Sequence, residues 1–197
     1  EAYREAGRDM DFRVVRIGLS GLSPTAHYRL GTLIQRVADV LGRRVTYVAS
    51  GDLSHKLTKD GPYGFAPEGP EFDRIVCDAF LSGDFLPLLA MSPRLAERAA
   101  ECGLRSFQMM AGALDQTEIP PELLSYEGPF GVGYAVAAFT PCGPERSCPK
   151  RDYLNVYEKA RAHEQSERRA SEDPYVRLAR LSLETHVRDG GRVRLPD

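Results

Sequence analysis

His55 is the residue of this sequence best suited to transfer a proton, because an imidazole gains and loses a proton near neutral pH. It ends the run Gly51-Asp52-Leu53-Ser54-His55, which closely follows the short apolar segment Val45–Ala49. We expect that segment to be a parallel strand, and open α/β sheets bind ligands beyond the carboxyl ends of such strands. Asp52, three residues before His55, could orient the imidazole or raise its basicity.

The same loop also has a purely structural interpretation. Asp52 and Ser54 could tie a tight turn through side-chain hydrogen bonds, with His55 an ordinary loop residue. Ser54 beside His55 does not indicate a hydrolase, because the sequence has no Gly-x-Ser-x-Gly elbow and adjacent residues rarely face each other as nucleophile and base. Both interpretations of His55 and Asp52 stay open at this point.

A second candidate site is the pair Glu101 and Cys102, which ends a predicted helical segment just before Gly103. A carboxylate or a thiolate at such a break can reach a metal, and either ligand suits iron. The alternative is a surface glutamate beside a small buried thiol. Cys142 and Cys148 lie in a Pro/Gly-rich loop with a gap that matches no common zinc spacing, so we interpret them as loop thiols.

The elements that must position these residues begin with a predicted strand–helix–strand unit. Phe12–Leu19 is rich in β-formers, and His27–Leu41 repeats apolar residues at the three- and four-residue spacing of an amphipathic helix. Val45–Ala49 supplies the second strand. Two strands joined by a crossover helix should run parallel, with the helix covering one face of the sheet.

The rest of the first unit alternates helices with two further strands. Residues 51–70 form a long loop that contains aromatic residues and a histidine, which favours a functional loop. The elements expected after it are helices near Glu71–Ser82, Pro87–Leu89, Pro93–Ala100 and Arg105–Leu114, then strands at Leu123–Tyr126 and Val132–Phe139. This order predicts an α/β fold with a mixed, partly parallel sheet flanked by helices.

The C-terminal third differs in composition from what precedes it. We place a first domain at residues 1–140, a charged linker helix at 141–171, and the start of a second, α+β domain at 172–197. Ser171 or Asp173 can cap a helix that ends at Gly190. A single amphipathic helix cannot bury its own apolar face, so we expect the second domain to be truncated.

Composition excludes several classes of partner. Of the 197 residues, 42% are hydrophobic and 27% charged, and the formal net charge is −2, so neither nucleic acid nor an anionic membrane is expected to bind. No apolar run has the length of a membrane span, and the charged N-terminus does not resemble a signal peptide. The four cysteines form no recognisable disulfide framework. A cytoplasmic location is therefore expected.

Three separated motifs, in order, resemble the class III (LigB-type) extradiol dioxygenase domain. They are Ala49–Leu57 with Gly61–Gly64, Glu101–Ser106 with Met110–Leu114, and Leu124–Tyr134. The match is to the version fused to an AMMECR-type domain, known as AmmeMemoRadiSam system protein A. The tail, Asp173–Val193, resembles the opening helix of that AMMECR-type domain. Together these similarities cover nearly the whole chain.

The resemblance implies a mechanism, a cofactor and partners. In this family, Fe(II) held by two histidines and a carboxylate binds a small aromatic diol and then dioxygen, and a separate histidine acts as acid–base catalyst. His55 matches that histidine. The third metal ligand should come from Glu101 or Cys102, because Memo proteins place a cysteine there and the dioxygenases a glutamate. Radical-SAM and Memo-like proteins are the partner proteins that the resemblance suggests.

This sequence departs from the family pattern in one respect. The two histidine ligands belong to the N-terminal half of the domain, and no histidine-containing loop precedes Phe12. We therefore expect this chain to be a fragment that is inactive alone and binds iron weakly at most. The alternative function is a Memo-like, non-catalytic binding or regulatory module of the AmmeMemoRadiSam group, because fold does not fix function.

Overall fold

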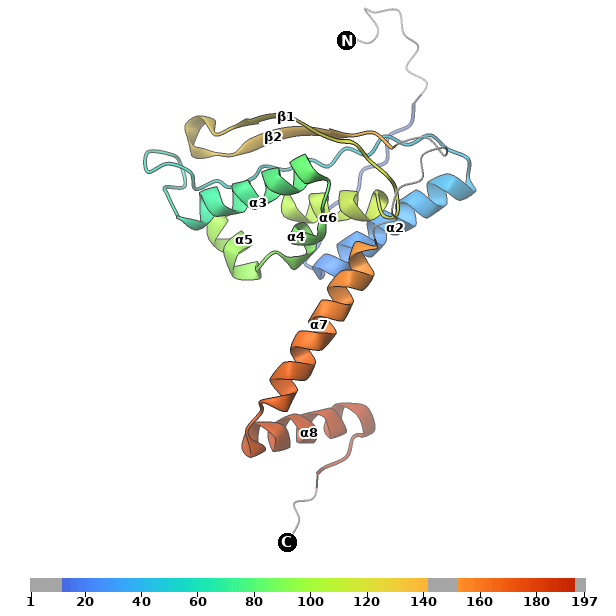
Figure 1. The fold of residues 1–197 in the computed structure, drawn as a ribbon, viewed down its shortest axis with the longest axis vertical. Helices are drawn as coiled ribbons and strands as arrows, with labels where there is room; N and C mark the ends of the chain where they lie inside the picture. The colour runs from blue at the N-terminus through green and yellow to red at the C-terminus, as the bar shows by residue number, and fades with distance from the viewer. Residues whose placement is uncertain (1–11, 142–151, 194–197) are drawn as a thin grey trace, which may run out of the picture.

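The computed structural model describes residues 12–141 and 152–193, and in it a group of helices packs beneath a two-stranded ribbon (Figure 1). A long helix, α7, leaves this body and carries the last helix, α8, at its far end. The elements are α2 (Pro24–Val40), α3 (Glu68–Ser82), α4 (Leu86–Ala90), α5 (Pro93–Ala99), α6 (Leu104–Ala113), β1 (Pro121–Glu127), the short 3-10 helix η1 (Pro129–Gly131), β2 (Tyr134–Phe139), α7 (Tyr153–Ala170) and α8 (Pro174–Asp189).

Helices α2 and α6 pack so closely that their backbones touch. A Cβ atom on Gly31 would lie 1.9 Å from the carbonyl oxygen of Met109, and one on Gly112 would lie 1.9 Å from that of Tyr28. Glycine is therefore the only residue that fits at either crossing point. The buried Tyr28 hydroxyl donates a hydrogen bond of 2.8 Å to Asp115, just after α6, and this bond fixes the register of the pair.

The hydrophobic core lies among four helices, α2, α3, α4 and α6. Its largest fully buried apolar side chains are Tyr28, Leu53, Phe72, Phe85, Leu88 and Leu89. Helix α3 ends at Gly83, which has a left-handed φ of 66°. Glycine adopts this conformation without strain. The Gly83 carbonyl accepts a 2.7 Å hydrogen bond from the buried hydroxyl of Tyr153, so α7 is anchored to the body at its first residue.

The sheet consists of β1 and β2, which pair antiparallel from Pro121 opposite Phe139 to Glu127 opposite Tyr134. This confirms the two strands predicted near Leu123–Tyr126 and Val132–Phe139. The pairing is irregular between Leu123 and Ser125. The connecting turn holds Phe130 at a φ of 59°, a left-handed conformation that is uncommon for a bulky side chain.

The predicted parallel strands Phe12–Leu19 and Val45–Ala49 are wrong for this structure, in which neither segment pairs as a strand within the described ranges. The described residues therefore do not form the predicted mixed, partly parallel sheet. They combine helices with a small antiparallel sheet, which is consistent with an α/β fold. Val14, Val15 and Val48 on these segments are exposed. The physical reason is that β-forming residues make an extended segment, whereas a strand also needs a neighbouring backbone to receive its hydrogen bonds.

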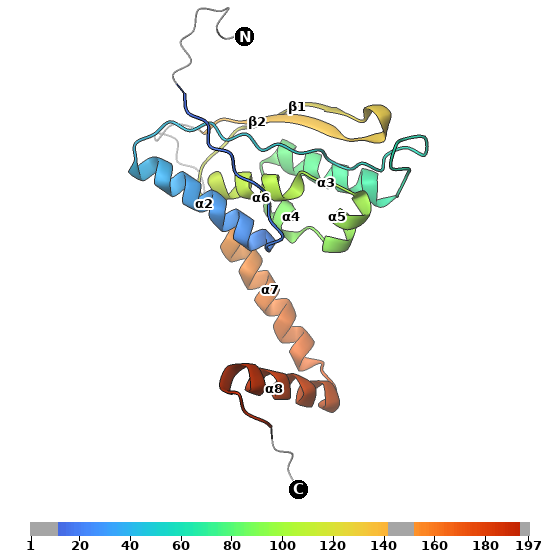
Figure 2. The same cartoon turned by 180° about the vertical axis from the view of Figure 1, so that it is seen from behind.

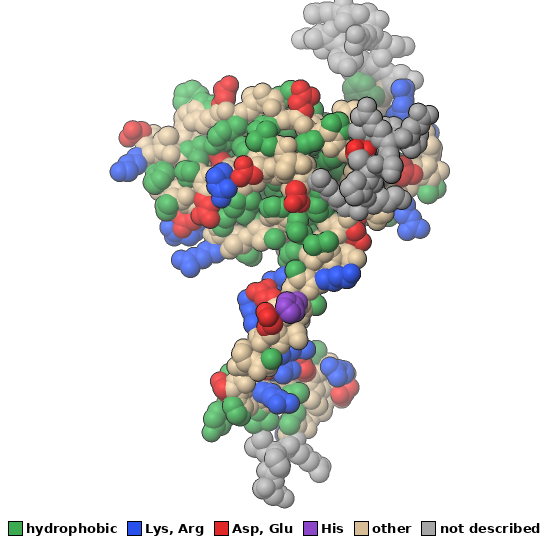
Figure 3. Space-filling model, viewed as in Figure 1, with side chains coloured by type: hydrophobic (Ala, Val, Ile, Leu, Met, Phe, Trp, Pro, Cys, Tyr) green, Lys and Arg blue, Asp and Glu red, His purple; other side chains and the backbone are tan. Residues whose placement is uncertain are grey.

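The C-terminal helices form where the sequence predicted them. Asp173 caps α8 by accepting hydrogen bonds from the backbone of Tyr175 and Val176, and Gly190 ends the helix with a φ of 64°. Acidic and basic side chains lie close together along both helices (Figure 3). Cys142 and Cys148, together with the start of the predicted linker, lie outside the described residues. Among the helices of the two described ranges, none combines the length and apolarity that a membrane span requires.

Candidate active site

The loop that carries His55 is held by hydrogen bonds to three other parts of the chain, at Gly133, Ala99 and Asp73. Leu53 donates a backbone hydrogen bond of 2.9 Å to Gly133, and Gly133 donates one of 2.7 Å back to Ser54. On the other side, the backbone N–H of His55 donates to the Ala99 carbonyl at 3.1 Å. The loop thus lies between the start of β2 and the end of α5, and its backbone is fixed before any side chain is considered. Figure 2 gives the view of this body from behind.

Asp73, which the sequence reasoning missed, is the third support of the loop. Its buried carboxylate accepts a 2.7 Å hydrogen bond from the Ser54 backbone and another of 2.7 Å from the hydroxyl of Tyr126. A Cβ atom on Gly133 would lie 2.1 Å from the same carboxylate, so glycine is required there. Burial raises the pKa of Asp73, and the two hydrogen bonds oppose that rise. The sequence feature that could have indicated Asp73 is its position as a lone carboxylate among the apolar residues of the buried face of α3.

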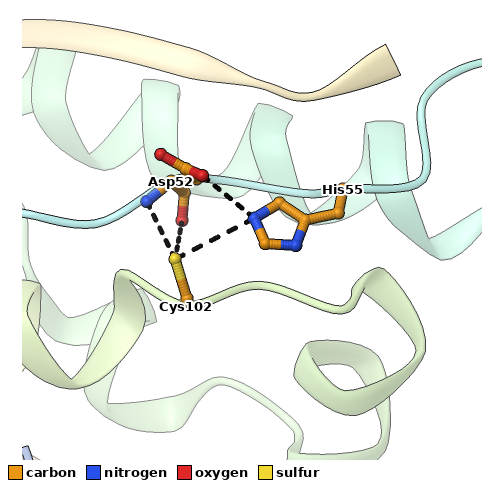
Figure 4. A group of neighbouring side chains, drawn as sticks. All are labelled: Asp52, His55 and Cys102. Carbon is orange, nitrogen blue, oxygen red and sulfur yellow. Dashed lines mark hydrogen bonds and ion pairs between the residues drawn. The ribbon is translucent and has the colours of Figure 1, made fainter. Parts of the chain in front are cut away.

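Asp52, His55 and Cys102 meet at the end of this loop (Figure 4). Nε2 of His55 lies 3.2 Å from a carboxylate oxygen of Asp52 and 3.9 Å from Sγ of Cys102. The backbone N–H of Asp52 donates to the same sulfur at 3.2 Å. One donor atom from each of the three residues lies within 4.8 Å of the others. The structure thus unites the predicted pair Asp52 and His55 with a residue 47 positions further along the chain.

Glu101 and Cys102, the two residues predicted as alternatives, point to different places. The Glu101 carboxylate accepts a 2.7 Å hydrogen bond from the backbone of Leu104 and so caps the start of α6. Burial raises its pKa, opposed mainly by that same backbone hydrogen bond. Cys102 faces His55 instead. Close approach of the backbones makes this possible, since a Cβ atom on Gly51 would lie 2.4 Å from Cα of Gly103.

Tyr63 completes the surroundings of the imidazole. Its ring stacks on that of His55, with 5.0 Å between ring centroids and 28° between the planes. The His55 side chain is 17% exposed, whereas Tyr63 is 58% exposed, so the tyrosine lies on the solvent side of the histidine. Tyr63, one of the aromatic residues of the long loop, therefore packs against the loop's own histidine.

Two of the other histidines have partners elsewhere in the fold. His27 is buried at the start of α2, where its ring nitrogens lie 3.0 Å from the Ser23 carbonyl and 3.3 Å from the Ser20 hydroxyl. His163 lies 3.4 Å from Glu167 on the surface of α7. Within the described residues, the donor group around Cys102 therefore contains one imidazole, that of His55. This arrangement is suited to proton transfer, because the Asp52 carboxylate accepts from Nε2–H and leaves the lone pair at Nδ1 to exchange a proton.

Two comparisons with known proteins find similarity over most of this chain. The model of a family described as the catalytic LigB subunit of aromatic ring-opening dioxygenase matches residues 5–137. The chain is also similar to Protein CA_C1420 of Clostridium acetobutylicum, with 34% identity over 188 residues, which make up 95% of this chain and 39% of the relative. The chain thus spans about two fifths of the length of that relative.

Proposed function

Because this chain belongs to the LigB family of aromatic ring-opening dioxygenases, we propose that the protein containing it opens the ring of a small aromatic diol with dioxygen. His55 is the acid–base residue in this proposal. The observation that supports it best is the 3.2 Å contact between Nε2 of His55 and the Asp52 carboxylate, in a loop whose backbone is fixed on three sides. Because Nε2–H donates to the Asp52 carboxylate, Nδ1 is the ring atom that takes a proton from a diol hydroxyl and later returns it.

Asp52 serves this step as an orienting group. Its carboxylate accepts a hydrogen bond from Nε2–H, fixes the rotation of the imidazole and stabilises the imidazolium that forms when Nδ1 accepts the proton. The supports from Ala99, Gly133 and Asp73 hold the loop backbone, so the ring starts from a defined position. Asp52 and these backbone contacts thereby orient the imidazole, and His55 holds the transferred proton at Nδ1.

The family implies Fe(II) held by two histidines and a carboxylate, and the residues present do not fit that set. The described residues bring together one imidazole, one cysteine sulfur and one carboxylate, and the imidazole is already hydrogen-bonded to the carboxylate. Cys102 can supply one donor, whereas Glu101 is occupied at the start of α6. A complete iron site would therefore need ligands from outside the described residues.

The first test compares the 197-residue chain with the full-length protein after loading with Fe(II) without oxygen. We expect the chain alone to retain less than stoichiometric iron and to leave catechol intact on exposure to air, and the full-length protein to bind iron and open the ring. His55→Gln in the full-length protein should lower kcat about 100-fold or more with iron content unchanged. Stoichiometric iron and ring opening by the 197-residue chain would refute the incomplete-site proposal, and full activity of H55Q would refute the role of His55.

A second candidate function is a Memo-like binding or regulatory module of the AmmeMemoRadiSam group, with radical-SAM or Memo-like proteins as partners. The position of Cys102 favours it, because a cysteine, and not Glu101, faces His55, as the resemblance to Memo proteins implies. A full-length protein that binds iron and leaves a panel of catechols uncleaved would support this function over the enzyme. The AMMECR-type domain that α8 would open belongs to the same proposal.

A further inference from the structure

We propose that Tyr63 is a positioning residue for His55, whose ring fixes the plane of the imidazole and closes one of its faces to the substrate. The inference rests on the proposed role of His55 as the acid–base residue. It starts from the stacked geometry of the two rings, at 5.0 Å and 28°. Stacking of this kind favours the stacked side-chain conformation about two- to tenfold over an unstacked one.

The hydrogen bond to Asp52 does not by itself determine the orientation of the imidazole. Asp52 and Cys102 both approach the same atom, Nε2, at 3.2 Å and 3.9 Å, so they hold one corner of the ring. A ring held at one corner can still tilt about that corner, and tilting moves Nδ1 and the direction in which Nδ1 exchanges its proton. A contact across the ring face removes this freedom. Tyr63 supplies such a contact.

The fold brings Tyr63 to His55 by turning the loop back on itself. Leu57 and Phe65 form an antiparallel bridge, and the backbone of Ala66 donates to the Lys56 carbonyl at 3.2 Å. Gly64 allows the turn with a left-handed φ of 72°. The bridge therefore places Tyr63, at the closed end of the loop, beside His55.

The position of Tyr63 also restricts how a substrate can approach. His55 is mostly buried and Tyr63 mostly exposed, so the tyrosine separates one imidazole face from solvent. The Nε2 edge faces Asp52 and Cys102. A diol must then reach Nδ1 by a route other than the ring face that Tyr63 covers. The aromatic ring of Tyr63 provides this restriction. A phenylalanine at position 63 should therefore keep the restriction, and an aliphatic residue should lose it.

The test on the 197-residue chain uses the variants Tyr63→Phe and Tyr63→Leu, with Phe65→Leu as the matched control on the same loop. The probe is the pair of imidazole C–H signals of His55 in NMR spectra, assigned by loss in H55Q. Removal of the stacked ring should shift both signals in Y63L, whereas Y63F and F65L should leave them near their wild-type positions. Unshifted His55 signals in Y63L would overturn the proposal, as would equal shifts in Y63L and F65L.

The second readout is steady-state kinetics of the full-length, iron-loaded protein with catechol. Y63L should lower kcat about tenfold with KM changed less than kcat, and Y63F should restore it, because a misplaced acid–base group affects the chemical step. Equal kcat in Y63L and wild type would overturn the proposal. If the full-length protein opens no ring, the proposed function fails, while the NMR experiment still decides whether Tyr63 positions His55.

Discussion

Asp73 is the residue on which the position of the His55 loop most depends. It is a buried carboxylate, and its two oxygens accept hydrogen bonds from the Ser54 backbone and the Tyr126 hydroxyl. A buried carboxylate is costly unless such donors compensate it. Here burial outweighs them and raises the pKa of Asp73. The loop is thus tied to α3 by a carboxylate whose charged form the fold disfavours relative to water.

This cost predicts how stability depends on pH. Because the folded-state pKa is raised, the contribution of Asp73 is fully present below the ordinary carboxyl pKa of about 3.9 and is lost as the pH rises through the raised value. Asp73→Asn keeps an acceptor for the Ser54 N–H and cannot ionise. We therefore expect the urea midpoint of D73N to rise relative to wild type from pH 4 to pH 7. A difference between the two proteins that is constant over this range would contradict the prediction.

The site residues differ in how far the sequence could predict them. Asp52 and His55 lie three positions apart in one turn, so their contact follows from local geometry and the sequence indicated it. Cys102 and Tyr126 reach the loop only through the packing of distant elements. The choice between Glu101 and Cys102 depends on one capping hydrogen bond at α6, which composition and spacing do not reveal.

At the scale of elements, the contact between α2 and α6 sets the shape of the body. Gly31 and Gly112 allow each helix to approach the backbone of the other, and Tyr28 locks the pair through Asp115. Side chains larger than hydrogen at these glycines would have to push two rigid helices apart. Such overpacking in a close-packed interior costs stability even when one methyl group is added.

Gly31→Ala should therefore lower the free energy of unfolding by about 2 to 3 kcal/mol. Thermal or urea unfolding followed by circular dichroism measures the loss. The matched control is Gly21→Ala, because a Cβ atom on Gly21 meets no atom within 4 Å. Equal stability of the two variants would show that α2 and α6 do not pack as closely as described.

The elements were predictable from sequence to different degrees. Helices carry their hydrogen bonds internally, so the apolar spacing of His27–Leu41 sufficed to predict α2. The hairpin of β1 and β2 was predictable because its two strands are neighbours along the chain, joined by a Gly-Pro turn. Phe12–Leu19 and Val45–Ala49 were predicted as strands from composition alone, and composition does not supply a pairing partner.

At the scale of the whole molecule, ion pairs connect α7, α8 and the segment between them. Arg169 near the end of α7 lies 2.9 Å from Glu184 of α8, and Arg180 lies 2.9 Å from Glu172 in the connection and 3.2 Å from Glu184. None of the described α8 residues is buried, so charged contacts, and not a shared core, hold the helix against α7. Surface ion pairs are screened by salt.

We expect Arg180→Gln to broaden the distribution of distances between spin labels placed on α7 and α8, measured by pulsed electron paramagnetic resonance. High salt should broaden the wild-type distribution in the same direction. Arg161→Gln is the matched control, because Arg161 pairs with Glu164 within α7. The same narrow distribution in R180Q and R161Q would contradict a role of these pairs in holding α8 against α7.

The length of α7 has a consequence for access to Asp52, His55 and Cys102. With 18 residues, the helix extends about 27 Å, and it leaves the body on the side away from the β1–β2 ribbon (Figure 1). Helix α8 therefore lies at the far end of α7, away from the β1–β2 ribbon. A protein bound at the exposed surface of α8 would therefore lie a helix length away from the body that carries His55.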